Sequence, residues 1–461
     1  MADLRLAPHL EAERDRILAT LVDWVRIPSI SSDPVRAADV RRSAEFCAQL
    51  LRDAGLEHVE VLDGHGAPAV VGDWRHAGPD APTFVVYGHH DVQPVDPLAL
   101  WESPPFEPTV VEGELRGRGT VDDKGQLLFE IEAVRGVLAA EGRLPVNLVF
   151  LVEGEEEVGS PSIASLLAAE AERLRCEAVV VSDTTMVAPD VPSTCVGMRG
   201  LVAFELALRT GAADLHSGLF GGAVPNPAHH LARLVAALHD DQGRVTLPGF
   251  YDKVRPLTDA EKASLAAVPF DEEAWMRTAG VRRLEGEAGR STLERIGTRP
   301  TAEVTGIGVG YTGEGMKTIV PAGGRAKVTF RLVADQDPDE VAASFRQWVA
   351  ERVPEGIEVV LTPHGGVAPA LTPVEHPAVG ALGRAIEKVW GRPPLFTREG
   401  GSGPEEALAR LLRAPVLFLG VGLPDDRFHA PNERLVLDQF ERGLLAAGEL
   451  WHELAAVEWR S

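Results

Sequence analysis

The sequence predicts an α/β fold in which a mostly parallel sheet forms a large domain, and a smaller α+β domain of the two-layer sandwich type is inserted into it. Short apolar runs rich in β-branched residues alternate with helical segments up to about residue 180 and recur near residue 420, as buried parallel strands do. Between these parts, alternating strands and two helices follow the pattern of a small α+β sandwich. We therefore expect residues 1–197 and 366–461 to form the large domain and residues 198–365 the inserted one.

The large domain begins with two predicted helices, followed by four apolar runs. In the first helix Ile17, Leu21 and Val25 share one apolar stripe, and a second amphipathic helix covers about residues 38–54. The four runs, which predict the strands of the sheet, cover residues 84–87, 146–152, 178–181 and 415–421. Helices are expected at 126–141, 162–175, 379–390 and 439–458.

The inserted domain has a different pattern. Half-exposed strands are expected at 202–209, 302–309, 325–331 and 358–362, and helices at 226–239 and 339–353. The middle of this region is polar and charged, and we predict no element there.

Length and composition narrow the class of protein. A chain of 461 residues is too long for one ordinary core, and 45% hydrophobic with 25% charged residues is usual for a globular protein. The net charge of −24 argues against nucleic-acid binding, and no apolar run is long enough to span a membrane. Cys47, Cys176 and Cys195 are odd in number and far apart, which argues against a disulfide framework. The first residues lack a signal-peptide pattern, so we expect a cytoplasmic protein.

Residues that can bind a metal follow each of the four predicted strands, and one more lies in a glycine-rich loop. They are, in chain order, His89 and Asp91, Asp122, the glutamates Glu155, Glu156 and Glu157, Asp183, and His429. In open α/β sheets, ligands bind at the carboxyl ends of the strands. We therefore expect these side chains to converge at one edge of the sheet.

The motif with His89 and Asp91 indicates the role of each residue, whereas the acidic run 155–157 does not. His89 and Asp91 face the same side of a strand, and a carboxylate beside a histidine ligand fixes its tautomer. The alternative, a hydrogen-bonded loop histidine, is disfavoured by the preceding strand and by the other groups. In the acidic run 155–157, adjacent carboxylates can divide between metal binding and proton transfer, because close like charges raise one pKa. The run itself leaves these roles open, and a solvated loop is its alternative.

Asp183 and His429 carry little information singly, since a lone aspartate after a strand is usually a turn residue. They matter because they complete a set of ligands that is large enough for two metal ions. Two histidines and three carboxylates suffice for two divalent ions if one carboxylate bridges them, and such a mixed nitrogen and oxygen set suits Zn²⁺ or Mn²⁺.

An ordered series of motifs extends over nearly the whole chain. The segments are 88–94 (Gly-His-His-Asp-Val-Gln-Pro), 117–125 (Gly-Arg-Gly-Thr-Val-Asp-Asp-Lys-Gly), 153–160, 182–183, 214–218 (Asp-Leu-His-Ser-Gly), 330–333 (Phe-Arg-Leu-Val), 398–403 and 429–433 (His-Ala-Pro-Asn-Glu). With these motifs the chain resembles the aminoacylase/carboxypeptidase G superfamily of dinuclear metallopeptidases. It is most similar to the carnosine-type, cytosolic non-specific dipeptidase branch.

The resemblance implies roles for the residues at the sheet edge. One ion would be held by His89, Asp122 and Asp183, and the other by Asp122, Glu157 and His429. Glu156 takes the place of the general base, which accepts the proton of a water between the two ions, and Asp91 would orient His89. The resemblance also implies a cis peptide bond between Asp122 and Asp123.

The inserted domain corresponds, by the same resemblance, to a lid that also forms a homodimer. His216 would reach the partner subunit's active site, bind substrate and stabilise the oxyanion, whereas its local sequence reads as a turn. Arg331 and Ser402 would bind the substrate carboxylate. The segment Gly403-Pro404-Glu405-Glu406 lacks the apolar residue that the family has after Gly-Ser, so substrate preference stays open.

The implied activity is metal-dependent hydrolysis of the amide bond of dipeptides or similar small amino-acid amides with a free carboxylate. The alternative is an N-acyl amino-acid deacylase or desuccinylase, which would use the same site. A non-catalytic binding or assembly protein is disfavoured, because every ligand and the base are present. A dinucleotide-dependent dehydrogenase is excluded, because the Gly117-Arg-Gly119 segment lacks the later glycine and an acidic ribose partner.

Overall fold

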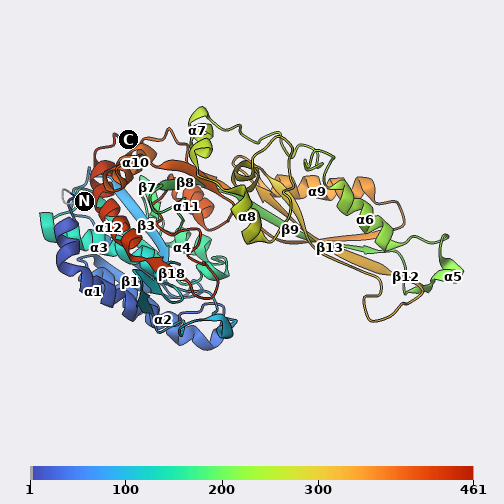
Figure 1. The fold of residues 1–461 in the computed structure, drawn as a ribbon, viewed down its shortest axis with the longest axis horizontal. Coiled ribbons are helices and arrows are strands. Elements are labelled where there is room, and N and C mark those ends of the chain that lie inside the picture. The colour runs from blue at the N-terminus through green and yellow to red at the C-terminus, as the bar shows by residue number, and fades with distance from the viewer. Residues whose placement is uncertain (1–3, 460–461) are drawn as a thin grey trace.

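The computed structural model describes residues 4–459, which form a larger body, containing the first and last of these residues, and a narrower body beside it (Figure 1). The larger body is built on a six-stranded sheet with the strand order β1-β2-β6-β3-β7-β17. Its strands are β1 (Glu57–Leu62), β2 (Ala69–Trp74), β3 (Thr83–His89), β6 (Asn147–Glu153), β7 (Ala178–Val181) and β17 (Val416–Phe418). The pairs β6–β3, β3–β7 and β7–β17 are parallel, whereas β1–β2 and β2–β6 are antiparallel.

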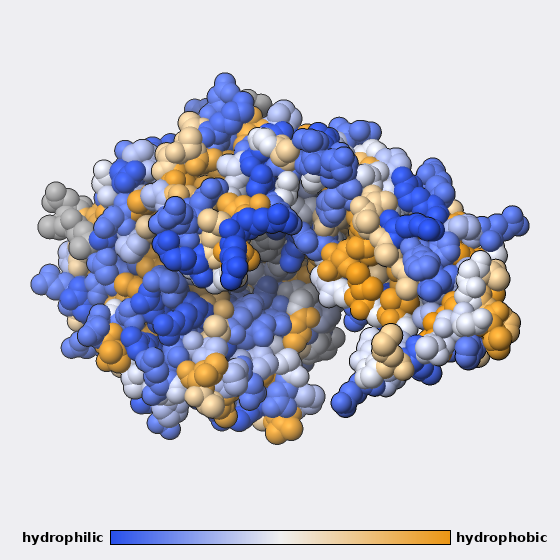
Figure 2. Space-filling model, turned by 45° about the vertical axis from the view of Figure 1, so that its right-hand side comes forward, coloured by the Kyte–Doolittle hydropathy of each residue, from blue (hydrophilic) through white to orange (hydrophobic). Residues whose placement is uncertain are grey.

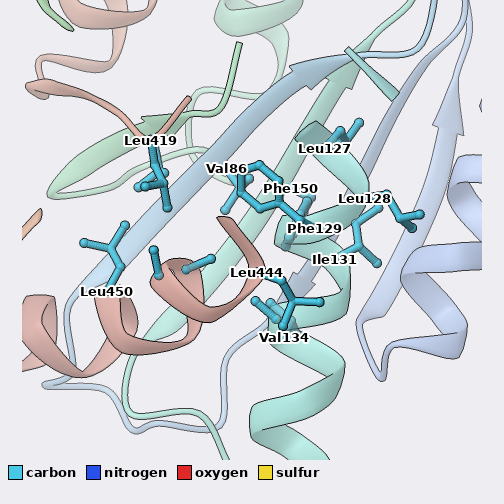
Figure 3. Packing of buried hydrophobic residues seen from close by; sticks show 14 of the residues in the cluster. Val86, Leu127, Leu128, Phe129, Ile131, Val134, Phe150, Leu419, Leu444 and Leu450 are labelled. Carbon is cyan, nitrogen blue, oxygen red and sulfur yellow. The ribbon is translucent and has the colours of Figure 1, made fainter. Parts of the chain in front are cut away.

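Helices cover both faces of this sheet. They are α1 (Ala7–Val25), α2 (Ala37–Asp53), α3 (Lys124–Glu141), α4 (Ile163–Ala169), α10 (Pro377–Trp390), α11 (Glu405–Leu412) and α12 (Leu437–Ala455). Side chains of α1, α2, α3, α10 and α12 form one core with the sheet, and those of α4 and α11 form another. In Figure 3, Val86 of β3 and Phe150 of β6 pack against Phe129 of α3 and Leu444 of α12. Burial on both faces explains why the central strands read as continuous apolar runs.

Two small sheets complete the larger body. One has the order β15-β8-β16 and consists of β15 (Ala370–Leu371), β8 (Ser193–Met198) and β16 (Leu395–Glu399). The other has the order β18-β5-β4 and consists of β18 (Arg434–Val436), β5 (Glu114–Arg116) and β4 (Thr109–Val111). Short 3-10 helices cover Pro34–Arg36, Leu98–Leu100 and Glu156–Val158. The pairing of β18 with β5 brings the chain after His429 next to the loop that contains Asp122.

The narrower body contains a four-stranded antiparallel sheet with the order β11-β13-β9-β14. Its strands are β9 (Gly200–Arg209), β11 (Thr301–Val309), β13 (Gly323–Leu332) and β14 (Glu358–Val367), and its two long helices are α6 (Pro227–Ala237) and α9 (Pro338–Arg352). Phe204 and Phe330 pack against Phe345 in the core between the sheet and the helices, with tilted and edge-to-face rings. The remaining elements are β10 (Leu215–His216), α5 (Ser217–Phe220), α7 (Asp259–Ala267), α8 (Glu272–Ala279), a π-helical turn (Glu294–Thr298) and β12 (Ile319–Val320).

The predicted fold class is confirmed, while several elements differ from prediction. The helix expected at 162–175 ends at Ala169. The strand expected at 415–421 ends at Phe418, and the amide of Val421 donates to the side chain of Gln126 instead of to a strand. The polar middle of the insertion contains α7 and α8. The domain boundaries after residues 197 and 365 stay predictions. Within residues 4–459, no helix is both long and apolar enough to cross a bilayer.

Candidate active site

The predicted metal-binding residues lie at the carboxyl ends of the parallel strands. His89 is the last residue of β3, and Asp183 lies two residues beyond β7. Glu156 and Glu157 begin the 3-10 helix that follows β6, and His429 lies in the loop between β17 and β18. Asp122 lies two residues before α3, and its peptide bond to Asp123 is cis, as the family resemblance implied.

These side chains form two adjoining groups that share Asp122. In the first group, Nε2 of His89 lies 3.1 Å from Oδ1 of Asp122 and 3.4 Å from Oδ2 of Asp183. In the second, Nε2 of His429 lies 2.9 Å from Oδ2 of Asp122 and 3.2 Å from Oε2 of Glu157. In each group the three ligand atoms lie within 4.8 Å of one another. The two oxygens of Asp122 therefore face different groups, which is the geometry of a bridging carboxylate.

The donor set fits two divalent cations. Oε1 of Glu157 is buried and has no hydrogen-bond partner within residues 4–459, although buried carboxylate oxygens normally have one. Burial, followed by the charge of Asp122, raises the pKa of Glu157 to about 7. Burial opposes a charge on His89, yet its hydrogen bonds to Asp122 and Asp183 hold its pKa well above the usual range. The carboxylates thus draw positive charge to this position, and metal ions would supply it.

Glu156 lies beside both groups and belongs to neither. Burial raises its pKa to about 9, and the nearby carboxylates of Asp183 and Glu157 add to the rise. Asp91 fixes the turn that carries it, because its two oxygens accept the amides of Glu156 at 3.3 Å and Glu157 at 3.2 Å. Asp91 also lies 3.4 Å from Nδ1 of His89. Asp91 therefore orients the predicted base and a predicted ligand together.

Glu433 joins the two loops that carry Asp122 and His429. Its carboxylate accepts the amides of Gly119, Val121 at 3.0 Å and Asp122 at 3.2 Å. It also accepts a hydrogen bond of 2.7 Å from the buried guanidinium of Arg118. The backbone of the bridging aspartate is thereby held by a residue four positions after His429.

The site opens into a pocket of about 390 Å³, and Figure 2 shows the surface hollowed between the two bodies. Its lining includes Glu156, Glu157, His429 and Ser402. Nη1 of Arg331 donates to Oγ of Ser402 at 2.9 Å, so the two predicted carboxylate binders are in contact.

His216 is not part of this assembly within one chain. It is exposed on β10, which pairs with β12 at the far end of the narrower body (Figure 1). Its Nδ1 accepts the amide of Gly218 at the start of α5. The prediction that it serves a partner subunit's site therefore stays a prediction.

Two further residues at the site were assigned no role from the sequence. Gln93 donates from Nε2 to Oε2 of Glu157 at 2.8 Å, and Glu433 holds the Asp122 loop as described above. Both stand inside the quoted motifs 88–94 and 429–433. Membership of a motif was the only signal, because each role depends on a contact between distant segments.

Comparisons with known proteins agree with this geometry. Residues 85–453 match the model of the peptidase family M20/M25/M40. The chain belongs to this family. Among relatives of this M20/M25/M40 peptidase, the Cys-Gly metallodipeptidase dug1 of Schizosaccharomyces pombe is 31% identical, with 98% of each chain covered. The human Beta-Ala-His dipeptidase is 29% identical over 93% of this chain and 88% of its own.

Solved structures of the family have the same fold as this M20/M25/M40 peptidase. The M20 family metallo-carboxypeptidase Sso-CP2 from Sulfolobus solfataricus matches with a TM-score of 0.83 at 30% identity, covering 96% of this chain and 99% of its own. The di-peptidase Dug1p of Saccharomyces cerevisiae matches with a TM-score of 0.78 at 27% identity, covering 98% and 99%. The resemblance to a family of dinuclear metallopeptidases is thereby confirmed.

Proposed function

We propose that this peptidase hydrolyses the amide bond of dipeptides, or of similar small amino-acid amides with a free carboxylate, in a metal-dependent reaction. The observation that carries the proposal is the pair of ligand groups sharing Asp122, with Glu156 beside both and the Arg331–Ser402 contact at the same pocket. The relatives named as dipeptidases and the carboxypeptidase Sso-CP2 support this class of substrate.

The residues divide the work as follows. His89, Asp122 and Asp183 would hold one ion, and Asp122, Glu157 and His429 the other. When bound, two such ions lower the pKa of a water between them and polarise the scissile carbonyl. Glu156 accepts the proton of the attacking water and passes it to the leaving amine, a role that suits a carboxylate that lines the pocket and belongs to neither ligand group.

The proposed substrate-binding residues are Arg331 and Ser402. Arg331 and Ser402 anchor the terminal carboxylate, and this contact places the scissile bond toward Glu156. Zn²⁺ or Mn²⁺ is the proposed metal, because the donors are two imidazole nitrogens and carboxylate oxygens. A cytoplasmic location is part of the proposal.

A homodimer through the narrower body completes the proposed site, with His216 contributing to the oxyanion in the partner. Leu219 and Phe220 next to it and Met316 nearby in the fold are exposed hydrophobic residues. Figure 2 shows hydrophobic side chains on the surface of this body. An exposed apolar surface of this kind is typical of a protein interface.

The test is E156Q, with metal content measured in the same samples. We expect kcat on a dipeptide to fall by about 10²- to 10⁴-fold, as for loss of a general base, with both ions retained. The matched control is E155Q, because the Glu155 carboxylate accepts the amides of Ala67 and Ser162 and belongs to neither ligand group. Near-normal turnover by E156Q with both ions bound would contradict the proposal.

The alternative acyl substrate is tested with matched pairs. The enzyme is assayed with Ala-Ala and Gly-Ala against N-acetyl-alanine and N-succinyl-alanine, all with Mn²⁺ or Zn²⁺ supplied. We expect faster turnover of the dipeptides. Preferential cleavage of an N-acyl amino acid would instead identify a deacylase that uses the same residues.

A further inference from the structure

Four arginines meet where the two bodies join, and two of them lack an acidic partner. Arg299 forms an ion pair of 2.6 Å with Glu287, and Arg398 forms one with Glu261. Both lie beside Arg199, whose Nη1 donates to the carbonyl of Arg299 and whose amide donates to Glu399 next to Arg398. Arg199 and Arg331 form no ion pair within residues 4–459.

Ser402 joins the guanidinium group of Arg331 to the main chain of Arg199. Oγ of Ser402 accepts from Nη1 of Arg331 at 2.9 Å and donates to the carbonyl of Arg199 at 2.5 Å. Ser402 also lines the pocket that contains Glu156 and His429. The guanidinium of Arg331 contacts Ser402 and that of Arg199 contacts the carbonyl of Gly400, so both lie against the 400–402 loop, whose Ser402 the proposed function assigns to the substrate carboxylate.

Most of the hydrogen-bonding capacity of Arg199 is unused. Its Nε donates to the carbonyl of Gly400 at 3.3 Å and its Nη1 makes the long contact of 3.5 Å with Arg299, both to neutral groups. A guanidinium has five donors in a planar fork that fits a carboxylate. Nη2 of Arg199 makes no protein hydrogen bond within the described chain.

The electrostatics of this pair favour a bound anion. Burial, followed by the charge of Arg331, lowers the pKa of Arg199 to about 10, so the protein offers the cation little compensation. The one acidic group that acts on it, Glu303, is exposed and too distant for an ion pair. One carboxylate on Arg331 satisfies one guanidinium and leaves the other uncompensated.

We propose that Arg199 binds a second carboxylate of the substrate, so that the enzyme prefers dipeptides whose C-terminal residue is aspartate or glutamate. The α-carboxylate lies on Arg331 and Ser402, and the side-chain carboxylate lies on Arg199. Two carboxylates on one residue are separated by only a few bonds, which matches two guanidinium groups that lie against one short loop, residues 400–402. The inference rests on the proposed function and narrows its substrate class.

The experiment compares acidic dipeptides with their neutral isosteres. Ala-Asp against Ala-Asn and Ala-Glu against Ala-Gln are assayed with the wild-type enzyme and with R199Q, R199K and R325Q. R325Q is the matched control, because Arg325 lies on the same strand as Arg331 and its side chain is 66% exposed. We expect the wild-type enzyme and R325Q to favour the acidic member by about 10- to 100-fold in kcat/KM, the range of charged hydrogen bonds.

In R199Q the acid-to-amide ratio should fall toward one, chiefly through KM, and R199K should recover part of it because the charge is kept. A purely structural role of Arg199 in holding Gly400 would lower both members of each pair equally and leave the ratio intact. A wild-type ratio near one, or an unchanged ratio in R199Q, overturns the inference.

Binding of the products separates this inference from the proposed function. We expect L-aspartate to inhibit or bind more tightly than L-asparagine by calorimetry, and R199Q to remove the difference. Equal turnover of acidic and neutral dipeptides would contradict the proposed substrate preference but not the proposed dipeptidase activity. If no dipeptide is cleaved but aspartate is still favoured through Arg199, the anion site stands and the proposed function fails.

Discussion

Replacing Glu433 by glutamine tests whether one buried carboxylate holds the site together. The Glu433 carboxylate accepts three backbone amides of the Asp122 loop and one guanidinium N–H of Arg118. A glutamine has the same shape and keeps one accepting oxygen, but its amide nitrogen cannot accept from Arg118. The substitution therefore removes one charge and leaves the rest of the packing in place.

The expected loss of unfolding free energy follows from the burial of the ion pair. The side chains of Arg118 and Glu433 are 1% and 0% exposed. Removing one partner of a buried ion pair costs about 3–5 kcal/mol of unfolding free energy, because the other charge is left uncompensated. Asp122 also loses part of the support of its backbone, and loss of such outer hydrogen bonds weakens metal binding by about 10- to 100-fold.

Urea unfolding of the metal-free protein measures the first effect, and competition with a fluorescent chelator measures the second. The control is E102Q, which breaks the pair of Glu102 with Arg116, where Glu102 is 65% exposed. Exposed pairs contribute about 0–1 kcal/mol, so E102Q should change neither quantity noticeably. Stability and metal affinity of E433Q equal to those of E102Q would refute the reasoning.

Three further predictions concern pH, subunit sharing and metal removal. Glu130 and Glu132 lie on α3, but burial raises the pKa of Glu130 to about 8, whereas hydrogen bonds from His9 and Arg16 outweigh burial and lower the pKa of Glu132 to about 2. In the unfolded chain both side chains have a pKa of about 4.5, so Glu130 lowers the free energy of unfolding increasingly as the pH rises from 4.5 to about 8. Glu132 instead raises the free energy of unfolding above pH 4.5, and this stabilisation is lost as the pH falls toward 2. In thermal melts at pH 7.5, E130Q should therefore be more stable than wild type and E132Q less stable; the same sign for both would contradict the assignment. Mixing inactive H216A with inactive E156Q should restore up to about a quarter of wild-type activity, since half of the dimers are mixed and each has one intact site; no recovery after verified subunit exchange would show that the site is not shared. Chelation should lower the melting temperature, by the equivalent of about 2.7 kcal/mol when free metal had been about 100-fold above Kd, and Mn²⁺ or Zn²⁺ should restore it; an unchanged melt with the metal gone would contradict a metal-stabilised site.

The parts of the fold that the sequence predicts well are those whose signal is local. β3, β6 and β7 are buried along their length, so each stands out as an apolar run, and the ligands follow directly after them. β2 is equally buried, yet its short segment contains Gly72 and Asp73 and was not recognised. The sheet of β8, β15 and β16 was also missed, because Ser193–Met198 carries small and polar residues.

In the candidate site, too, the residues with a local signal could be predicted and those that act through distant contacts could not. Its ligand residues could be named in advance because histidines and carboxylates follow several strands whose carboxyl ends meet at one edge of the sheet. The division of labour within 155–157 could not be derived from spacing, and came from family resemblance. Glu433 and Gln93 act through contacts that close over long stretches of chain, 314 residues between Glu433 and Gly119 and 64 between Gln93 and Glu157. No local pattern encodes such contacts.

The position of His429 has a consequence for how the protein is made. The three residues of the first ligand group, His89, Asp122 and Asp183, all lie in the first 183 residues, and the strands that lead to His89 and Asp183, β3 and β7, are neighbours in the sheet. The second group needs His429, which follows the whole narrower body in the chain. On the ribosome, the first group is therefore synthesised long before the second can exist. The order of synthesis therefore sets the order in which the site can form. The edge strand β17, His429 of the second group and Glu433 are all synthesised shortly before the last helix.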